Sequence, residues 1–407
     1  MRFPALLVLC ASPLLAWADI SLDAQALERQ AFDHHAFDQQ VRAAAETLMR
    51  ENAIPGLAIA LTDNGQQYFY EFGVSDKTSG QAVTRDTLFE LGSVSKAFTA
   101  TLAGYAQAQG KLALEHKVGE YLAEFAGSPF GELSLINLAT HTSGGMPLQL
   151  PDSVSDNQTL TGWLRQWQPE HPPGTWRTYA NPSIGMLGVI AARQLHLPYV
   201  AAMQDTLLPA LGLSNSYLEV PRDKQALYAW GYDKDLLRVR VNPGMLAAEA
   251  YGMKSSSRDL LHFVEANLGR VELPAPLKAA LAQTQHGYYQ RGAMTQDLIW
   301  EQYDYPLALQ TLLDGNDNRS ALLGTLVEAL DPPRVPQQRV WLNKTGSTNG
   351  FGAYVAFVPY QQRGVVLLAN RNYPNSERVK LAWRLFELLD QHAAQPASAA
   401  STNSSRS

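Results

Sequence analysis

A serine and a lysine three residues apart form the pattern with the clearest chemical meaning in this sequence. Ser93 and Lys96 stand in FELGSVSKAFTA, residues 89–100, where an apolar run typical of a helix begins. Residues i and i+3 share one face of a helix, so we expect the Lys96 ammonium beside the Ser93 hydroxyl. A serine becomes nucleophilic when a neighbouring base takes its proton, and a desolvated lysine can share that work without a histidine. The same pair also fits an N-cap serine followed by a surface lysine.

Two further motifs favour the catalytic alternative. The triplet YAN, residues 179–181, follows a loop rich in proline and glycine and precedes an apolar helix. The triplet KTG, residues 344–346, ends an expected strand, and Ser347 opens the turn after it. Each motif is weak by itself, and Tyr179 alone would more often be a core residue with a satisfied hydroxyl. Together, in this order and context, they predict a serine–lysine site for acyl transfer.

The elements that must position these residues are strands at the two ends of the chain and helices in its middle. The patterns predict a helix at 36–51, strands at 56–61 and 68–74 around an Asn-Gly turn, a mainly helical stretch at 93–255, strands at 340–342, 353–358 and 365–368, and a helix from 376 to about 389. We expect an α+β architecture in which both chain ends build one antiparallel sheet flanked by helices, beside an all-helical domain. The expected domains are 19–111 together with 256–392, and 112–255, followed by a disordered tail at 393–407.

The first 18 residues have the features of a secretory signal peptide. Arg2 gives a basic start, an apolar stretch too short to span a bilayer follows, and AWA at residues 16–18 fits a cleavage site. We therefore expect cleavage near Ala18. The single cysteine, Cys10, lies inside this segment, so the mature chain would have no disulfide and no thiolate chemistry. A lipid anchor on Cys10 is the alternative, but Leu9 stands where such a signal has a small residue.

Composition excludes several classes of protein. The 407 residues are 46% hydrophobic and 17% charged, which is ordinary for a globular protein and unlike a disordered or fibrous one. The formal net charge of -6 argues against a nucleic acid or an anionic membrane as partner. No stretch after the signal peptide has the length of a membrane helix, so we expect no membrane contact after cleavage.

Longer stretches around these motifs carry a resemblance to a known family. They read FELGSVSKAFT, LATHTSGGMPLQ, YANPSIG, LNKTGSTNGFGAYVAFVP and LLANRNYPN, and the likeness runs from about residue 40 to 390. In these stretches the sequence resembles the class C (AmpC-type) serine β-lactamases. The resemblance implies the fold of penicillin-recognising serine hydrolases, a periplasmic location, a monomer, no cofactor, a β-lactam substrate and a preference for cephalosporins.

The resemblance also implies roles for individual residues. Ser93 would attack the lactam carbonyl and form an acyl-enzyme, and the backbone N–H groups of Ser93 and Ser347 would form the oxyanion hole. Tyr179 would relay protons under the influence of Lys96 and Lys344. Whether the resting base is Tyr179 or neutral Lys96 stays open, because coupled groups titrate as a set. The residues implied in substrate binding are Gln149, Asn181, Tyr251, Lys344, Thr345, Gly346, Asn375 and Arg378.

A second catalytic motif and a metal site are both rejected. SDN at residues 155–157 matches the second motif of class A β-lactamases, but Glu170, the nearby candidate for the deacylating base, stands in an unsuitable loop. We therefore interpret residues 153–159 as a polar loop with a helix cap before Trp163 and Trp167. Histidines 34, 35, 141 and 171 lack the spacing and carboxylate of a zinc helix, so we expect no metal.

Two other functions use the same residues. A D-alanyl peptidase or esterase would share the serine, lysine and tyrosine but would remain acylated by penicillin instead of releasing it. A β-lactam receptor that signals after acylation would need a membrane or effector segment, and the sequence shows none. The sequence does not decide whether Glu90, Trp300 and Tyr303 line the cleft.

Overall fold

The structure, a computed structural model, describes residues 35–317, 319 and 323–394. The expected signal peptide with Cys10, and the tail beyond residue 394, lie outside the described residues. Contacts within the chain define two units. One unit comprises residues 45–384, and the described residues of the other are 35–44 and 385–394. The expected division near residues 111 and 255 stays a prediction.

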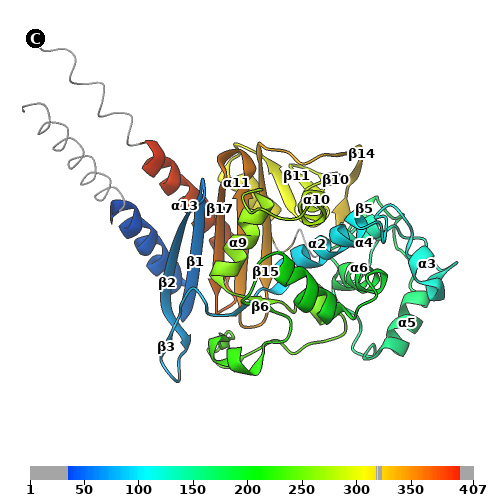
Figure 1. The fold of residues 1–407 in the computed structure, drawn as a ribbon, viewed down its shortest axis with the longest axis horizontal. Helices are drawn as coiled ribbons and strands as arrows, with labels where there is room; N and C mark the ends of the chain where they lie inside the picture. The colour runs from blue at the N-terminus through cyan, green and yellow to red at the C-terminus, as the bar shows by residue number, and fades with distance from the viewer. Residues whose placement is uncertain (1–34, 318, 320–322, 395–407) are drawn as a thin grey trace, which may run out of the picture. The chain divides into compact units, whose positions relative to one another are not determined.

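A sheet of ten strands forms the centre of the larger unit. Its strand order is β14-β10-β11-β12-β15-β16-β17-β1-β2-β3. Their bounds are β1 (Gly56–Asp63), β2 (Gln66–Asp76), β3 (Gln81–Ala82), β10 (Gly287–Arg291), β11 (Met294–Asp297), β12 (Glu301–Asp304), β14 (Glu328–Arg334), β15 (Val340–Ser347), β16 (Gly352–Val358) and β17 (Arg363–Ala369). Figure 1 shows the strands from the two ends of the sequence, blue and orange, side by side. The prediction that both ends of the chain build one antiparallel sheet is therefore confirmed.

The β1–β2 hairpin forms as its sequence predicts. Asn64 and Gly65 take the positive φ angles of 51° and 88° that a tight two-residue turn between twisted strands requires. Strand β1 is buried along nearly its whole length, because β2 and β17 flank it and helix α9 (Ser257–Asn267) packs against it. A continuous apolar strand such as GLAIAL is therefore the expected sequence for this central position.

Strands β10, β11, β12 and β14 were not predicted from the sequence. Strands β11 and β12 have four residues each and carry polar side chains that are almost all buried, including Gln296, Asp297 and Glu301. The alternation of apolar and polar residues that marks a half-exposed strand is therefore absent. Strand β14 contains Pro332 and Pro333, which suit its position at the sheet edge, where a missing N–H costs no ladder bond.

Helices surround the sheet and fill the middle of the sequence. Helix α2 (Ser95–Ala108) packs against α6 (Asn181–Gln194) and α10 (Ala275–Thr284), which explains why it is apolar on almost every side. The turn η1 (Gly92–Val94) just before α2 packs against β15 and β16. The other helices are α3 (Val118–Tyr121), η2 (Ala123–Phe125), α4 (Leu135–Ala139), α5 (Asn157–Gln166), η3 (Ala201–Leu207), α7 (Leu208–Ala210), η4 (Arg222–Leu227), α8 (Ala247–Ala250), α11 (Leu309–Gly315), η5 (Pro359–Gln361), α13 (Asn375–Ala394) and one at 35–51.

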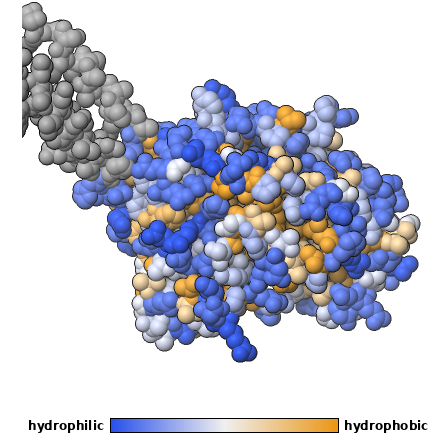
Figure 2. Space-filling view, viewed as in Figure 1, coloured by the Kyte–Doolittle hydropathy of each residue, from blue (hydrophilic) through white to orange (hydrophobic). Residues whose placement is uncertain are grey.

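Short strands form three small sheets besides the ten-stranded one among the described residues. They are β4 (Phe89–Glu90), β6 (Ser216–Tyr217) and β9 (Lys254–Ser255) in one small sheet, β5 (Trp176–Arg177) with β13 (Thr325–Leu326), and β7 (Gly231–Tyr232) with β8 (Arg238–Val239). The face in Figure 2 is mostly hydrophilic, with hydrophobic residues in small groups over its middle. Within the described ranges, no helix combines the length and apolar character needed to cross a bilayer.

Candidate active site

Close packing of two glycines brings the Ser93 turn against the end of strand β15. A Cβ atom on Gly92, whose φ angle is 51°, would lie 2.4 Å from the backbone nitrogen of Ser347. A Cβ atom on Gly346 would lie 2.0 Å from the carbonyl oxygen of Leu91 and 3.1 Å from the nitrogen of Ser93. The distances of 2.4 and 2.0 Å are shorter than real Cβ contacts, so only glycine permits this approach. The backbones of Ser93 and Ser347 are thereby held close together.

Lys96 lies under the nucleophile candidate, as the spacing predicts. Its ammonium nitrogen is 2.9 Å from Ser93 Oγ and donates to the carbonyl oxygen of Ala250 at 2.8 Å. The side chain is fully buried. Burial is the main cause that lowers the pKa of Lys96 to about 8, and the charge of Lys344 lowers it as well. The charge of Tyr179 acts in the opposite direction and raises it. A substantial fraction of Lys96 is therefore neutral near pH 8 and can accept a proton.

Tyr179 lies between two ammonium groups. The nitrogens of Lys96 and Lys344 are each 5.0 Å from its ring centroid. Burial raises the pKa of Tyr179, but the charges of Lys344 and Lys96 lower it to about 8. Its buried hydroxyl makes no hydrogen bond of ordinary geometry among the described residues, although Ser93 and Lys96 lie near enough to favour the phenolate. Tyr179 and Lys96 therefore lose their protons over the same pH range and act as a coupled pair.

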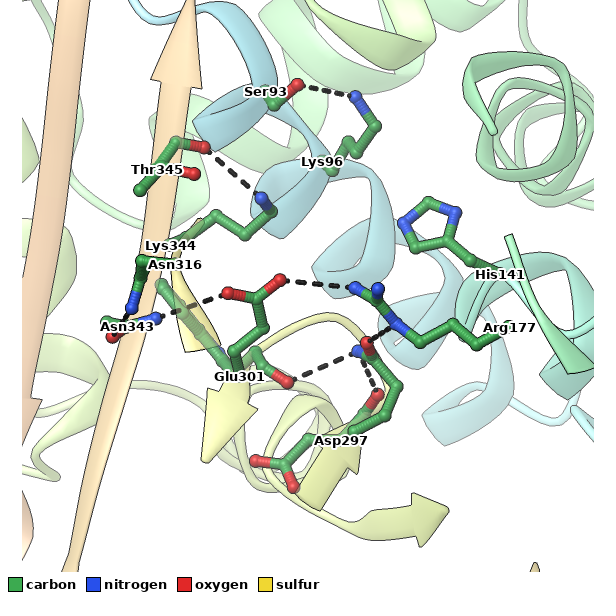
Figure 3. A network of polar contacts seen from close by, with 12 residues as sticks. Ser93, Lys96, His141, Arg177, Asp297, Glu301, Asn316, Asn343, Lys344 and Thr345 are labelled. Atoms are coloured by element: carbon green, nitrogen blue, oxygen red, sulfur yellow. Dashed lines mark hydrogen bonds and ion pairs between the residues drawn. The ribbon is translucent and has the colours of Figure 1, made fainter. Parts of the chain in front are cut away.

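These side chains open onto one cleft of about 260 Å³. Nine of the residues predicted for the site line it: Ser93, Gln149, Tyr179, Asn181, Lys344, Thr345, Gly346, Ser347 and Asn375. Lys96 does not line the cleft itself, but its ammonium group donates a hydrogen bond to Ser93 Oγ. Lys344 donates to the Thr345 carbonyl oxygen at 3.2 Å (Figure 3). The sequence motifs, of which Ser93 and Lys344 are 251 positions apart, thus converge in space.

The structure does not bring Arg378 into the cleft. The Arg378 side chain is fully buried, and its guanidinium donates to the carbonyl oxygens of Gly346 at 2.6 Å and Tyr373 at 2.6 Å. It also donates to Ser347 Oγ at 3.0 Å. A guanidinium engaged in this way supports the end of β15. The contact of Arg378 with a substrate carboxylate stays a prediction.

Tyr251 also lies outside the residues that line the cleft. It is half-buried, and burial raises its pKa above the ordinary value. A Cβ atom on Gly244 would lie 3.4 Å from the Tyr251 hydroxyl, so this ring packs beside the 244–250 segment. The neighbouring Ala250 holds Lys96 through its carbonyl group. The role of Tyr251 as a wall of the side-chain pocket stays a prediction.

Glu301 is a cleft residue that the sequence did not reveal. Its carboxylate is paired with the buried guanidinium of Arg177 at 3.1 Å and accepts from Asn343 at 3.5 Å (Figure 3). Arg177 also donates to Gln296 at 2.7 Å, which continues the network under the cleft. A buried pair of this kind is retained because each charge would be costly alone. The other unpredicted lining residues are Leu148, Gly315, Asn316 and Asp317.

The only sequence signal for Glu301 would have been its strand. Strand β12 was not recognised, so nothing placed Glu301 opposite Asn343 of β15, with which it is in register. Glu90, Trp300 and Tyr303, which the sequence left open, are buried and do not line the cleft. Of the unpredicted lining residues, Glu301 comes from an unrecognised strand, and Gly315, Asn316 and Asp317 come from the end of α11 and the residues after it.

Asp297 is a buried acid near this network, and it yields a prediction for stability. Its carboxyl group is fully buried without a hydrogen-bond partner among the described residues, and burial raises its pKa well above the ordinary value. The folded state therefore keeps a proton that the unfolded chain loses above about pH 4. The stability associated with this group is complete below that pH and is lost as the pH rises toward the folded-state pKa.

The substitution Asp297→Asn keeps the shape of the side chain but removes its ionisable group. At pH 8 we expect it to raise the free energy of unfolding by about 1 to 3 kcal/mol and to flatten its fall between pH 5 and 8. Denaturant titrations at several pH values measure both effects. Asp152→Asn, a change at an exposed carboxyl, is the matched control and should alter neither. An unchanged pH slope in Asp297→Asn would contradict the assignment of a buried neutral acid.

The rejected motifs have structural explanations. The Asp156 side chain accepts the N–H of Thr159 at 2.8 Å and caps α5, so the interpretation of residues 155–157 as a helix cap is confirmed. In the described part of the chain, no group of three histidine, cysteine, aspartate or glutamate residues is arranged to hold a metal ion.

Comparisons with known proteins agree with the geometry. The family model Beta-lactamase matches residues 41–390. A beta-lactamase of Pseudomonas fluorescens is 47% identical over 353 residues, which cover 87% of this chain and 99% of that protein. The crystal structure of a Beta-Lactamase/D-Alanine Carboxypeptidase from Pseudomonas syringae superposes with a TM-score of 0.86 at 53% identity, covering 86% of this chain and 99% of that one.

A structure of a class C beta-lactamase in complex with cefoxitin superposes with a TM-score of 0.85 at 46% identity, covering 87% and 99% of the two chains. The resemblance noted in the sequence is therefore confirmed, and so is the predicted α+β fold. Family model, relatives and solved structures agree over more than four fifths of the chain. On this evidence the chain belongs to the beta-lactamase family and is a class C serine β-lactamase in fold and enzyme type.

Proposed function

We propose that this enzyme hydrolyses the β-lactam ring in the periplasm through an acyl-enzyme on Ser93, with a preference for cephalosporins. One observation supports this proposal most: Lys96 Nζ lies 2.9 Å from Ser93 Oγ while Tyr179 lies between Lys96 and Lys344. A hydroxyl beside two groups that titrate near pH 8 can lose its proton as it attacks. The chain would act as a monomer after removal of the signal peptide, without a cofactor or metal.

Acylation joins the Ser93 oxygen to the lactam carbonyl carbon. The Ser93 proton passes to the coupled pair of Tyr179 and Lys96, and the same pair returns a proton to the ring nitrogen as the C–N bond breaks. Water then repeats the sequence: it gives a proton to the pair and attacks the ester carbonyl, and Ser93 leaves with a proton. Both halves need a base that is partly deprotonated near neutral pH, which agrees with a pKa of about 8 for both groups.

Charge that develops on the carbonyl oxygen would be stabilised by the N–H groups of Ser93 and Ser347. The close approach of the two backbones at Gly92 and Gly346 supports this role. One such donor is typically worth about 3 to 4 kcal/mol of barrier. Because these donors belong to the backbone of a turn and a strand, they need little reorganisation during the reaction.

Substrate binding is assigned to the side chains around this centre. Gln149 and Asn181 would hold the amide side chain of the drug, and Lys344, Thr345 and Asn375 would face its carboxylate. An anionic substrate fits fixed donors and a cation at this end of the cleft.

A second candidate function is D-alanyl carboxypeptidase activity, because one similar structure is that of a protein named Beta-Lactamase/D-Alanine Carboxypeptidase. Both reactions share acylation of a serine and differ in the release of a β-lactam acyl group. Purified enzyme with a hundredfold excess of a chromogenic cephalosporin separates them. We expect many equivalents to be hydrolysed at a steady rate. We also expect kcat/KM to be higher for the cephalosporin than for benzylpenicillin. Loss of one equivalent followed by inhibition would favour the peptidase.

A further inference from the structure

His141 holds the segment of chain that carries Tyr179 at three points. The carbonyl oxygen of His141 accepts the N–H of Thr178 at 2.9 Å. Its ring nitrogen Nδ1 accepts the N–H of Ala180 at 3.3 Å. Its imidazole packs on the phenol ring, with 4.2 Å between centroids and a tilt of 38°. One residue therefore contacts the positions before, at and after the tyrosine.

These contacts belong to a longer pairing between two loops. The carbonyl oxygen of Thr142 accepts the N–H of Gly174 at 2.8 Å, and that of Leu148 accepts the N–H of Asn181 at 3.0 Å. The pairing sets the position of the backbone, and the His141 side chain adds a direct contact with the Tyr179 ring. The position of the phenol hydroxyl over Ser93 and Lys96 therefore depends on this ring as well as on its own backbone.

The hydrogen bond to Ala180 determines the protonation state of the imidazole. An amide N–H can only donate, so Nδ1 must be unprotonated, and the neutral ring carries its proton on Nε2. Tyr179 packs on the ring, and the cations whose charges act on it are Arg177, Lys96 and Lys344. Figure 3 shows His141 in the same region as these three cations. Burial and these cations hold the pKa of His141 well below its ordinary value. The ring thus stays neutral at working pH and adds no further positive charge beside the phenol.

The backbone at residue 141 restricts which side chains can replace histidine. Its φ angle is 62°, in the left-handed region that asparagine and histidine tolerate better than most residues. Asparagine also places an acceptor oxygen the same number of bonds from Cα as Nδ1. The Nε2 atom of His141 is buried without a partner among the described residues. A buried donor without a hydrogen-bond partner costs stability, so a histidine at this position suggests a functional benefit that offsets the cost.

We propose that His141 is a positioning residue for Tyr179: as a neutral ring it holds the phenol within reach of Ser93 and between Lys96 and Lys344. This proposal rests on the proposed function of Tyr179 as proton relay. A misplacement of a catalytic group by about 1 Å can cost a hundredfold in rate. Loss of the clamp also moves the phenol away from the two ammonium groups, and its pKa then rises from about 8 toward the ordinary value of a tyrosine.

The test compares His141→Ala and His141→Asn with wild type, using a chromogenic cephalosporin over the range pH 5 to 10. Rates are divided by the number of active sites, counted by mass spectrometry of the acyl-enzyme. For His141→Ala we expect kcat to fall about 10- to 100-fold with a smaller change in KM. We also expect the rising acid limb of its pH–rate profile to move to higher pH. His141→Asn keeps the acceptor for Ala180 and should lie between wild type and alanine in both measures.

Ser143→Ala is the matched control. Ser143 is buried in the same loop and its hydroxyl pairs with that of Ser183 at 2.9 Å, and among the described residues it makes no hydrogen bond to the Tyr179 hydroxyl. It should lower the midpoint of thermal unfolding while leaving the rate per active site and the pH profile as in wild type. A purely structural role of His141 predicts the same result for His141→Asn and His141→Ala, and that result would overturn the proposal.

Failure of this inference and failure of the proposed function give different results. If Tyr179→Phe keeps wild-type turnover, the relay itself is wrong. If Tyr179→Phe is inactive while both His141 variants keep the wild-type rate and pH profile, only the clamp is wrong. If His141→Ala does not fold, the smaller shift expected for His141→Asn decides the question.

Discussion

Ser93→Ala is expected to abolish β-lactam turnover while leaving the fold intact. The hydroxyl is the atom that would form the covalent bond, and loss of a serine nucleophile typically costs about 10⁶ in kcat. Ser93 Oγ accepts a hydrogen bond from Lys96, and the core contacts of η1 and α2 come from other side chains, so removal of the hydroxyl leaves them in place. Steady-state hydrolysis of a cephalosporin, circular dichroism and thermal unfolding measure the two effects separately.

Thr101→Ala provides the comparison for this variant. Thr101 is buried in the same helix, and its hydroxyl donates to the carbonyl oxygen of Ala97 at 2.7 Å, away from the cleft. It should keep its turnover and lose only some stability. Near-normal hydrolysis by Ser93→Ala would contradict the assignment of the nucleophile, whatever the stability of the variant.

Tyr179→Phe should lower kcat by about 10² to 10⁴, because general acid–base groups contribute factors of this size. Its pH profile is as informative as its rate. The negative charge of Tyr179 raises the pKa of Lys96, so its removal lowers that pKa from about 8. A base works in its deprotonated form, and the activity that remains should therefore begin its rise at lower pH than in wild type.

This profile also decides between the two candidates for the resting base. If neutral Lys96 acted alone, Tyr179→Phe would keep most of its activity and show only the shift to lower pH. A large loss in rate assigns the relay to the phenol, with the lysine as its partner. Tyr217→Phe removes a hydroxyl that donates to the Ser214 carbonyl oxygen at 2.8 Å, outside the cleft, and should match wild type in both respects.

The sequence predicted those parts of the fold whose signals are local. The Asn-Gly turn, the apolar run of β1 and the helix after Ser93 each depend on residues close in sequence, and the structure confirms them. Strands β11 and β12 were not predicted because their buried residues are largely polar and show no apolar pattern. Glu301 is satisfied by Arg177, which lies 124 positions away. No pattern within a short window can reveal a partner at that distance.

How well the sequence places a residue of the candidate site depends on what fixes its side chain. A motif that includes a turn, such as KTG followed by serine, fixes the backbone and so places Thr345 and Ser347 along the cleft. A single residue on a helix, such as Arg378, has a long side chain whose direction the sequence does not determine. In the structure the Arg378 side chain runs to the end of β15, where the backbone carbonyl groups of Gly346 and Tyr373 accept its N–H donors.

The central claim is that Ser93, Lys96, Tyr179 and Lys344 form one catalytic unit with the serine as nucleophile. Rapid acid quench during cephalosporin turnover, followed by peptide mapping, tests it most directly. We predict an acyl adduct on the peptide containing Ser93, formed and lost at rates that account for steady-state turnover. An adduct on a different residue, or one on Ser93 that persists while hydrolysis continues, would contradict the account.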